Sequence, residues 1–203
     1  MFEDRYQAGE LLAEKLLEFQ GRGVVVLAIP RGGVPVAKAI SEKLKVQLGV
    51  IVTKKIGAPE QEELAVGAVG PEGEVVLDKA LVQKLGVGEK DLEKAVKKAQ
   101  EKVKKYSSKF KDKINLKNKI VILVDDGIAT GATIKAAIKH LTQKDVARII
   151  LASPVAPKEA LTEFENLVDK VVVLTTPADF QAVGQFYKNF PQVTDEEVVQ
   201  LLQ

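Results

Sequence analysis

The chain has 203 residues, a formal net charge of +2 and no cysteine. The lack of cysteine excludes disulfides, thiolate metal sites and cysteine nucleophiles, and a charge this small gives no reason to expect binding to nucleic acid or to a membrane surface. The fractions of hydrophobic (46%) and charged (29%) residues are ordinary for a globular protein, and a chain of this length can bury one substantial core.

The start of the chain has acids early and leucines at helical spacing, unlike the basic and then apolar order of a signal peptide. No stretch of the sequence is apolar over the length that crosses a bilayer. We therefore expect a cytoplasmic protein that binds neither nucleic acid nor a membrane.

Helical and strand patterns alternate along most of the chain. Helical periodicity predicts helices over residues 5–19, 34–45, 89–113, 131–143 and 157–168. Apolar runs rich in β-branched residues predict strands over residues 24–30, 46–53, 119–125, 147–155 and 170–176. This alternation predicts a doubly wound parallel sheet covered by helices on both faces, in a single α/β domain over residues 1–203.

Three segments depart from the alternation. Residues 54–77 are irregular in pattern, with two short hairpin strands near "AVGAV" and "EVVL", and residues 56–76 are expected to form a flexible loop. The inserted segment 88–113, mostly one long helix, has an apolar seam that predicts packing on the domain's own core or, because the spacing is coiled-coil-like, a contact in a homodimer. Residues 177–203, called the C-terminal hood below, contain four of the chain's ten aromatic residues.

Three of the predicted strands end in sequences suited to binding. "PRGGVP" offers a cation and two glycines, "TKKIGAP" offers two lysines, and "DDGIATGAT" offers an acid pair followed by small residues and threonines. In open α/β sheets, ligands bind at the carboxyl ends of the strands. Cations and backbone amides suit phosphates, and paired carboxylates suit sugar hydroxyls or the water shell of a metal. A sugar carrying several phosphates would satisfy all three sequences.

The loop after Asp125 and Asp126 leads into the predicted helix 131–143. The amides at the start of this helix, with Thr130 and Thr133, would form an anion site for one phosphate. A helix cap by Thr130 is the simpler alternative, but a cap requires no acid pair. Neither a P-loop nor a dinucleotide fingerprint is present. The single histidine, His140, is expected to be solvated or to cap the helix.

The segment "VILVDDGIATGAT" resembles the phosphoribosyl pyrophosphate (PRPP) motif of type I phosphoribosyltransferases, and "IPRGGVP" resembles the pyrophosphate loop of that family. "TKKIGAP…ELAVGAV" and "FQAVGQFYKNFPQVTDEEV" are similar to a group described only as predicted phosphoribosyltransferases. The similarity runs over nearly the whole chain. It implies an Mg²⁺-dependent transferase of nucleotide salvage that moves the 5-phosphoribosyl group of PRPP to a nitrogen acceptor, such as a nucleobase, and releases pyrophosphate.

The resemblance also implies roles for individual residues. The residues expected to bind PRPP are Asp125, Asp126, Gly127, Ala129, Thr130, Gly131, Ala132 and Thr133. Those expected to face the pyrophosphate are Arg31, Gly32, Gly33, Lys54 and Lys55. Arg31, Lys55, Asp125 and Asp126 are the expected catalytic residues. Mg²⁺ would lie near the two aspartates, held through PRPP and water and not by direct ligation, and a non-proline cis peptide is expected between Pro30 and Arg31.

The acceptor is less well defined by the sequence. Members of the family that salvage hypoxanthine and guanine have an aspartate, thought to handle the proton of the base, where this chain has Ala129; adenine- and xanthine-type members have alanine there. The aromatic residues Phe180, Phe186 and Tyr187 would form the acceptor pocket by stacking on a flat base, with plain core packing as the alternative. A PRPP-binding regulatory protein without catalysis is the second interpretation, although the chain shows no helix-turn-helix or basic face for DNA.

Overall fold

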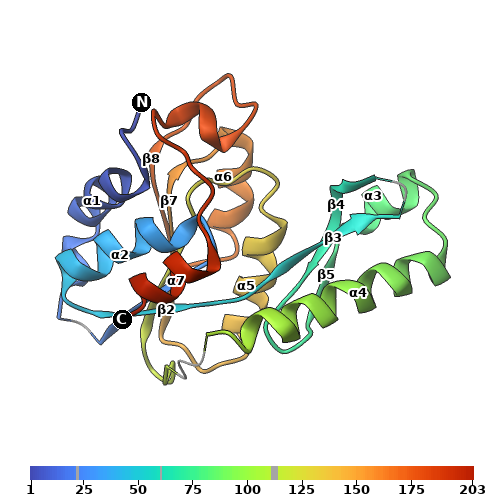
Figure 1. Cartoon of the computed structure of the whole chain (residues 1–203), viewed down its shortest axis with the longest axis horizontal. Helices are drawn as coiled ribbons and strands as arrows, with labels where there is room; N and C mark the ends of the chain where they lie inside the picture. The colour runs from blue at the N-terminus through green and yellow to red at the C-terminus, as the bar shows by residue number, and fades with distance from the viewer. Residues whose placement is uncertain (22, 60, 111–113) are drawn as a thin grey trace. The chain divides into compact units, whose positions relative to one another are not determined.

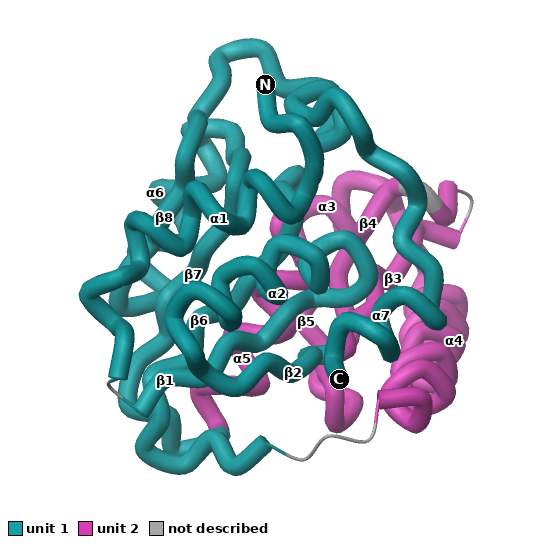
Figure 2. Tube along the Cα trace, turned by 60° about the vertical axis from the view of Figure 1, so that its left-hand side comes forward, with its two compact units in different colours: residues 1–51, 112–129, 144–203 teal, residues 52–111, 130–143 magenta. Residues whose placement is uncertain are grey.

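The computed structural model describes residues 1–21, 23–59, 61–110 and 114–203. The chain divides into two compact units, one of residues 1–51, 112–129 and 144–203 and the other of residues 52–111 and 130–143 (Figure 2). Each unit contains its own sheet. The assignment of the whole chain to one domain stays a prediction.

The first unit is built on a five-stranded parallel sheet with the strand order β2-β1-β6-β7-β8 (Figure 1). The strands are β1 (Val24–Ala28), β2 (Gln47–Val50), β6 (Ile120–Val124), β7 (Arg148–Val155) and β8 (Lys170–Thr175). Every residue of β1 is buried, as is all of β6 except its first residue. The continuous apolar runs in these strands follow from burial on both faces of the sheet.

The helices of the first unit are α1 (Arg5–Lys15), α2 (Gly33–Leu44), α6 (Lys158–Glu165) and α7 (Asp195–Leu201), with short 3₁₀ turns at Leu17–Phe19 and Val183–Phe186. The connections β1-α2-β2 and β7-α6-β8 run in opposite directions across the sheet. Because such crossovers are right-handed, they place α2 and α6 on opposite faces. The expected α/β fold with a parallel sheet is confirmed.

The second unit has a three-stranded antiparallel sheet in the order β3-β4-β5. Its elements are β3 (Lys54–Ala58), β4 (Gln61–Val69), β5 (Val75–Leu77), α3 (Lys79–Lys84), α4 (Glu89–Ser107) and α5 (Ala132–Leu141). The two hairpin strands expected near "AVGAV" and "EVVL" are confirmed, because they correspond to the end of β4 and to β5, which pair antiparallel. The irregular pattern expected for the rest of residues 54–77 is wrong where β3 and the first part of β4 pair with each other. Glycine explains the miss: a Cβ at Gly57 would lie 2.3 Å from the carbonyl oxygen of Glu62, so close strand pairing requires a residue that sequence patterns assign to loops.

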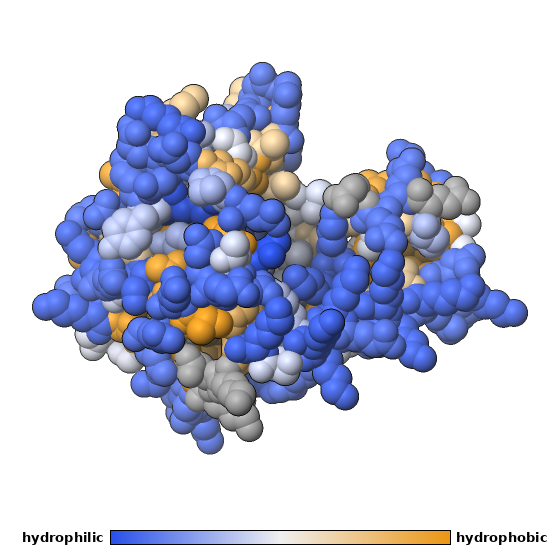
Figure 3. Space-filling model, in the orientation of Figure 1, coloured by the Kyte–Doolittle hydropathy of each residue, from blue (hydrophilic) through white to orange (hydrophobic). Residues whose placement is uncertain are grey.

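Helix α4 packs its apolar seam on this sheet. Ala99 and Val103 are buried in one cluster with Ile56, Val66 and Val69, while the face that carries the lysines is hydrophilic (Figure 3). The seam thus belongs to the core of the second unit, which agrees with the interpretation that it packs on the protein's own core. The helix ends at Ser107, earlier than predicted, and residues 111–113 of the expected helix lie outside the described residues. None of the described helices is long and apolar enough to cross a membrane.

Candidate functional site

The candidate site of the first unit begins where β1 and β6 end. These neighbouring strands are parallel and in register, from Val24 opposite Ile120 to Ala28 opposite Val124. Strand order reverses between them, since the connection from β1 leads to β2 on one side and the connection from β6 leads to β7 on the other. Such a switch point is where open α/β sheets bind ligands. The loops that follow the two strands therefore lie next to each other.

Two glycines allow these loops to touch. A Cβ atom at Gly32 would lie 2.0 Å from Oδ2 of Asp126, and one at Gly33 would lie 2.7 Å from the carbonyl oxygen of Val124. Real Cβ atoms do not approach other atoms so closely, so the sequence "RGG" is a steric requirement of the contact. The peptide bond between Pro30 and Arg31 is cis, as expected. Arg31 is exposed, with Nη1 3.8 Å from Oδ1 of Asp195.

The acid pair lies at the end of β6 and is partly buried. The backbone N–H of Asp126 donates to Oδ1 of Asp125 over 2.9 Å, and the hydroxyl of Tyr187 donates to the carbonyl of Asp126 over 2.6 Å. Burial, together with the neighbouring carboxylate, raises the pKa of Asp125 well above its ordinary value. Burial also raises the pKa of Asp126, against the opposing effect of the Arg5 guanidinium. The pair is therefore a costly arrangement without a ligand.

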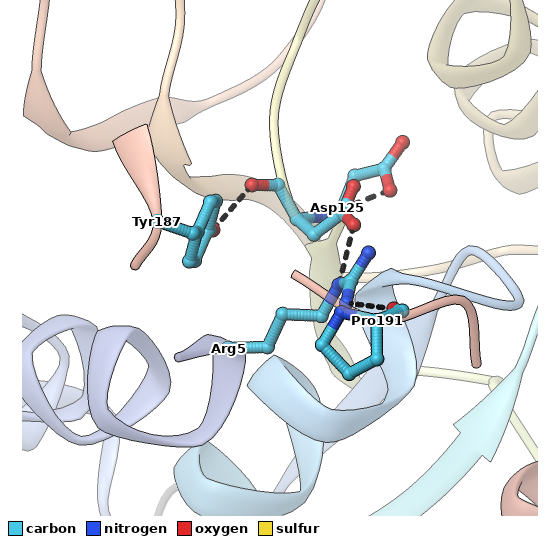
Figure 4. A network of polar contacts seen from close by, with 5 residues as sticks. Arg5, Asp125, Tyr187 and Pro191 are labelled. Carbon is cyan, nitrogen blue, oxygen red and sulfur yellow. Dashed lines mark hydrogen bonds and ion pairs between the residues drawn. The ribbon is translucent and has the colours of Figure 1, made fainter. Parts of the chain in front are cut away.

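Arg5, which the sequence analysis did not identify, binds the second acid of the pair. Its Nε donates to Oδ2 of Asp126 over 2.7 Å, and its Nη1 donates to the carbonyl of Pro191 over 2.8 Å (Figure 4). The guanidinium carbon lies 3.6 Å from the ring centre of Phe190. The sequence contains one indication of this role. Arg5 is the first residue of helix α1, and a cation is unusual at this position because the helix dipole favours anions there.

The C-terminal hood packs against the start of the chain. The N–H of Phe2 donates to the carbonyl of Phe186, and Tyr187 is buried with its ring centre 5.4 Å from that of Phe2. Phe180 and Phe186 stack on each other with ring centres 5.5 Å apart. Tyr187 is part of a buried cluster with Phe2 and Ala8, and Phe186 packs against this cluster, whereas Phe180 is half-buried. A role in holding an acceptor stays a prediction.

Of the remaining residues of the expected site, Gly127 and Ala129 follow the acid pair in the first unit, whereas Lys54, Lys55 and residues 130–133 belong to the second unit. Lys54 and Lys55 begin β3, and Nζ of Lys54 lies 4.2 Å from the ring centre of Tyr106. Gly131 is the N-cap of α5, with a left-handed φ of 67° and no side-chain cap hydrogen bond. Thr130 therefore does not cap this helix. The N–H groups of the first turn of α5 have no intrahelical partners and can bind an anion.

His140 is neither solvated nor a cap, so that prediction is wrong. Its ring is buried, and Nδ1 lies 2.6 Å from Oε1 of Glu74. Burial tends to raise the pKa of Glu74, but the hydrogen bonds from His140 and the backbone outweigh it and hold this pKa below its ordinary value. With Glu72, these two residues form a group of potential metal ligands within 4.8 Å of one another, in which His140 and Glu74 already bind each other.

Comparison with known proteins identifies the family. Residues 4–188 match the family model of the phosphoribosyl transferase domain. The chain belongs to this family. A Mycobacterium tuberculosis protein provisionally named as a phosphoribosyl transferase is 41% identical over 205 residues, which cover 100% of this chain and 46% of the relative. The chain thus spans about half the length of the curated relatives it matches.

Two solved structures are similar in fold to this chain. The TT1426 protein of Thermus thermophilus is 38% identical, with a TM-score of 0.83 over 100% of this chain and 97% of its own. A hypoxanthine-guanine phosphoribosyltransferase from Bacillus anthracis is 18% identical, with a TM-score of 0.51 over 91% of this chain and 87% of its own. The second comparison concerns the fold alone.

Proposed function

We propose that the chain transfers the 5-phosphoribosyl group of PRPP to a nitrogen acceptor of the nucleobase class and releases pyrophosphate. The family membership supports the reaction class. The observation that carries the proposal is the placement of Asp126 against Gly32 at the switch point of the parallel sheet. This contact joins the two loops that a ribose carrying a pyrophosphate would need.

The acid pair and the loop after it would hold the ribose 5-phosphate part. Asp125 and Asp126 would accept hydrogen bonds from the ribose hydroxyls, because ionised carboxylates are strong acceptors. The amides and hydroxyls of residues 129–133 would hold the 5′-phosphate at the start of α5. The left-handed conformation of Gly131 supports this part of the proposal, since it leaves the first amides of the helix without a side-chain cap.

The pyrophosphate would be bound by the backbone of Gly32 and Gly33 and by the cation Arg31. The donor set near the acid pair also fits Mg²⁺ held through PRPP and water. Asp125 and Asp126 supply carboxylate oxygens at the end of β6, where Oδ1 of Asp125 accepts from the N–H of Asp126 and Oδ2 of Asp126 accepts from Arg5. Oxygen donors of this kind are those that Mg²⁺ prefers. When bound, the ion would neutralise charge on the leaving pyrophosphate.

In the proposed reaction, the bond from C1 of the ribose to the pyrophosphate oxygen breaks and a bond from C1 to the acceptor nitrogen forms. The electron pair of the broken bond leaves with pyrophosphate, and the acceptor loses a proton to solvent or to a base. The chain would lower the barrier by holding the ribose and by stabilising the charge on the leaving group. Ala129 supplies no acid or base at the position where hypoxanthine/guanine enzymes carry aspartate.

The test is pyrophosphate release from PRPP and Mg²⁺ in the presence of single purines, pyrimidines and simple amines. We expect release with one acceptor or a narrow class of acceptors. Asp126→Asn should abolish it, while Asp145→Asn, an exposed residue, should leave it unchanged. PRPP binding without release across the whole panel would instead favour the regulatory protein, and the absence of PRPP binding would contradict both interpretations.

A further inference from the structure

We infer that Arg5 is a positioning residue of the ribose site, which fixes the carboxylate of Asp126 and joins it to the C-terminal hood. The inference rests on the proposed function, because it assigns Arg5 a role in binding the ribose of PRPP. It concerns the first unit alone, in which Arg5, Asp126 and the hood all lie.

The geometry of Arg5 matches such a role. One guanidinium edge binds the carboxylate of Asp126 and a neighbouring nitrogen binds the carbonyl of Pro191 (Figure 4). The planar face of the guanidinium covers the ring of Phe190. Three different kinds of contact thus hold one guanidinium. Arginine suits this arrangement because its donors point along fixed directions in one plane and its face stacks on aromatic rings.

The stability of helix α1 does not explain why a cation is buried here. Asp4 already caps the helix by accepting from the N–H of Gln7, and a positive charge at the first helical residue opposes the helix dipole. The side chain of Arg5 is only 10% exposed and that of Asp126 only 15%. A buried ion pair of this kind contributes little net stability compared with apolar residues of the same volume. Its position beside the proposed ribose acid is a better explanation.

Asp126 is held at its side chain and at its main chain. Arg5 binds Oδ2, and the hydroxyl of Tyr187 donates to the backbone carbonyl. Both partners connect Asp126 to residues 187–191 of the hood. A carboxylate held in this way needs no ordering when the ribose arrives, and preorganisation of this kind lowers the entropic cost of binding. We assign the other oxygen, Oδ1, to the ribose hydroxyls.

The experiment measures the affinity for PRPP with Mg²⁺ by titration calorimetry in the wild type, Arg5→Met, Arg5→Lys and the matched control Arg148→Met. Arg148 is an exposed arginine of the same unit, at the amino end of β7. We expect Arg5→Met to weaken PRPP binding at least about tenfold, the size expected when a charge-assisted hydrogen bond is lost. Arg5→Lys should weaken it about threefold, because lysine keeps the charge but not the planar donors. Arg148→Met should have no effect.

A second ligand separates positioning from a general structural role. Inorganic pyrophosphate with Mg²⁺ has no ribose, so its affinity should be the same in the wild type and in Arg5→Met. Equal losses for PRPP and pyrophosphate, or unchanged PRPP binding, would overturn the inference and leave the proposed function intact. A wild type that binds no PRPP would instead overturn the proposed function. Thermal unfolding checks that each variant folds, and if Arg5→Met does not, unchanged PRPP binding by Arg5→Lys overturns the inference.

Discussion

Gly32 lies so close to Asp126 that a Cβ atom on the glycine would be 2.0 Å from Oδ2 of the aspartate. The two residues come from loops after neighbouring parallel strands, and they are 94 positions apart in the sequence. Glycine is therefore required at position 32 if the carboxylate of Asp126 is to occupy its observed position. The loop with a cation and glycines and the loop with two acids therefore form one structural unit, on which the proposed PRPP site depends.

Gly32→Ala should displace the carboxylate of Asp126 and weaken PRPP binding. The added methyl group cannot fit beside Oδ2 without moving the side chain out of its place. We expect the affinity for PRPP to fall at least about tenfold, which corresponds to about 1.4 kcal/mol, as measured by calorimetry. Gly88→Ala is the control, because a Cβ there meets its nearest atom at 3.8 Å, an ordinary contact. Unchanged PRPP binding in Gly32→Ala would show that Asp126 does not need this position.

Asp125→Asn should stabilise the protein near neutral pH while it weakens PRPP binding. The pKa of Asp125 is raised above its ordinary value of 3.8, so its contribution to stability is fully present below that value and is lost as the pH rises through the raised pKa. Asparagine keeps the acceptor for the N–H of Asp126 and carries no charge. We expect the free energy of unfolding at about pH 7 to rise, because the neutral side chain removes the cost of burying a carboxylate beside that of Asp126.

Denaturant unfolding over a pH series measures this effect. The gain from Asp125→Asn should shrink as the pH falls toward about 4, because the wild-type carboxyl group then becomes neutral as well. Asp145→Asn, at an exposed position of the same unit, should show no comparable gain. A loss of stability at neutral pH in Asp125→Asn would contradict the raised pKa.

The strands of the parallel sheet could be predicted because strands that are buried on both faces have continuous apolar sequences. In β1 and β6, each residue is apolar, and the run stops where the loops of the proposed site begin. The three-stranded sheet could be predicted only in part, at the two hairpin strands near "AVGAV" and "EVVL". In β3, Gly57 is required by close pairing, since a Cβ would lie 2.3 Å from the carbonyl oxygen of Glu62, and a glycine in a short strand resembles a loop until its partner strand is known.

The acid pair could be predicted in the same way, because its residues are adjacent in the sequence and follow a buried strand. Arg5 and His140 could not. Arg5 binds an acid 121 positions away, and His140 binds one 66 positions away. Both side chains belong to helices whose sequences have ordinary helical periodicity, so the pattern predicts the helix and gives no partner for the charged group. Long-range pairing of this kind emerges only from the packed structure.

Glu74→Gln should destabilise the second unit at neutral pH. The pKa of Glu74 is held below its ordinary value of 4.5, so its contribution is present above that value and is lost as the pH falls through the lowered pKa. Glutamine cannot form the charge-assisted bond with the buried His140. We expect a loss of about 1–3 kcal/mol in the free energy of unfolding at about pH 7, and the loss should disappear in acid. Glu93→Gln, at an exposed position of helix α4 in the same unit, is the control and should change stability by less than about 0.5 kcal/mol.

Tyr187→Phe tests the main-chain anchor of Asp126. Phenylalanine keeps the ring contacts with Phe2 and Phe190, whose ring centres lie 5.4 and 5.0 Å from that of Tyr187, and removes only the hydroxyl that donates to the carbonyl of Asp126. A buried acceptor that loses its donor costs about 1–3 kcal/mol. We therefore expect a loss of this size in the free energy of unfolding and a roughly three- to tenfold weaker affinity for PRPP, a range that corresponds to about 0.7–1.4 kcal/mol.

The pH dependence distinguishes this hydrogen bond from a charge effect. Burial raises the pKa of Tyr187 above its ordinary value of 10.0, so its contribution to stability is fully present below that value and is lost only in more alkaline solution. The difference between the wild type and Tyr187→Phe should therefore stay constant from about pH 6 to about pH 9. Tyr6→Phe is the matched control, because the hydroxyl of Tyr6 donates to Glu42 at an exposed position, where loss of a hydrogen bond costs little. Equal effects of the two substitutions would show that the hood does not anchor Asp126.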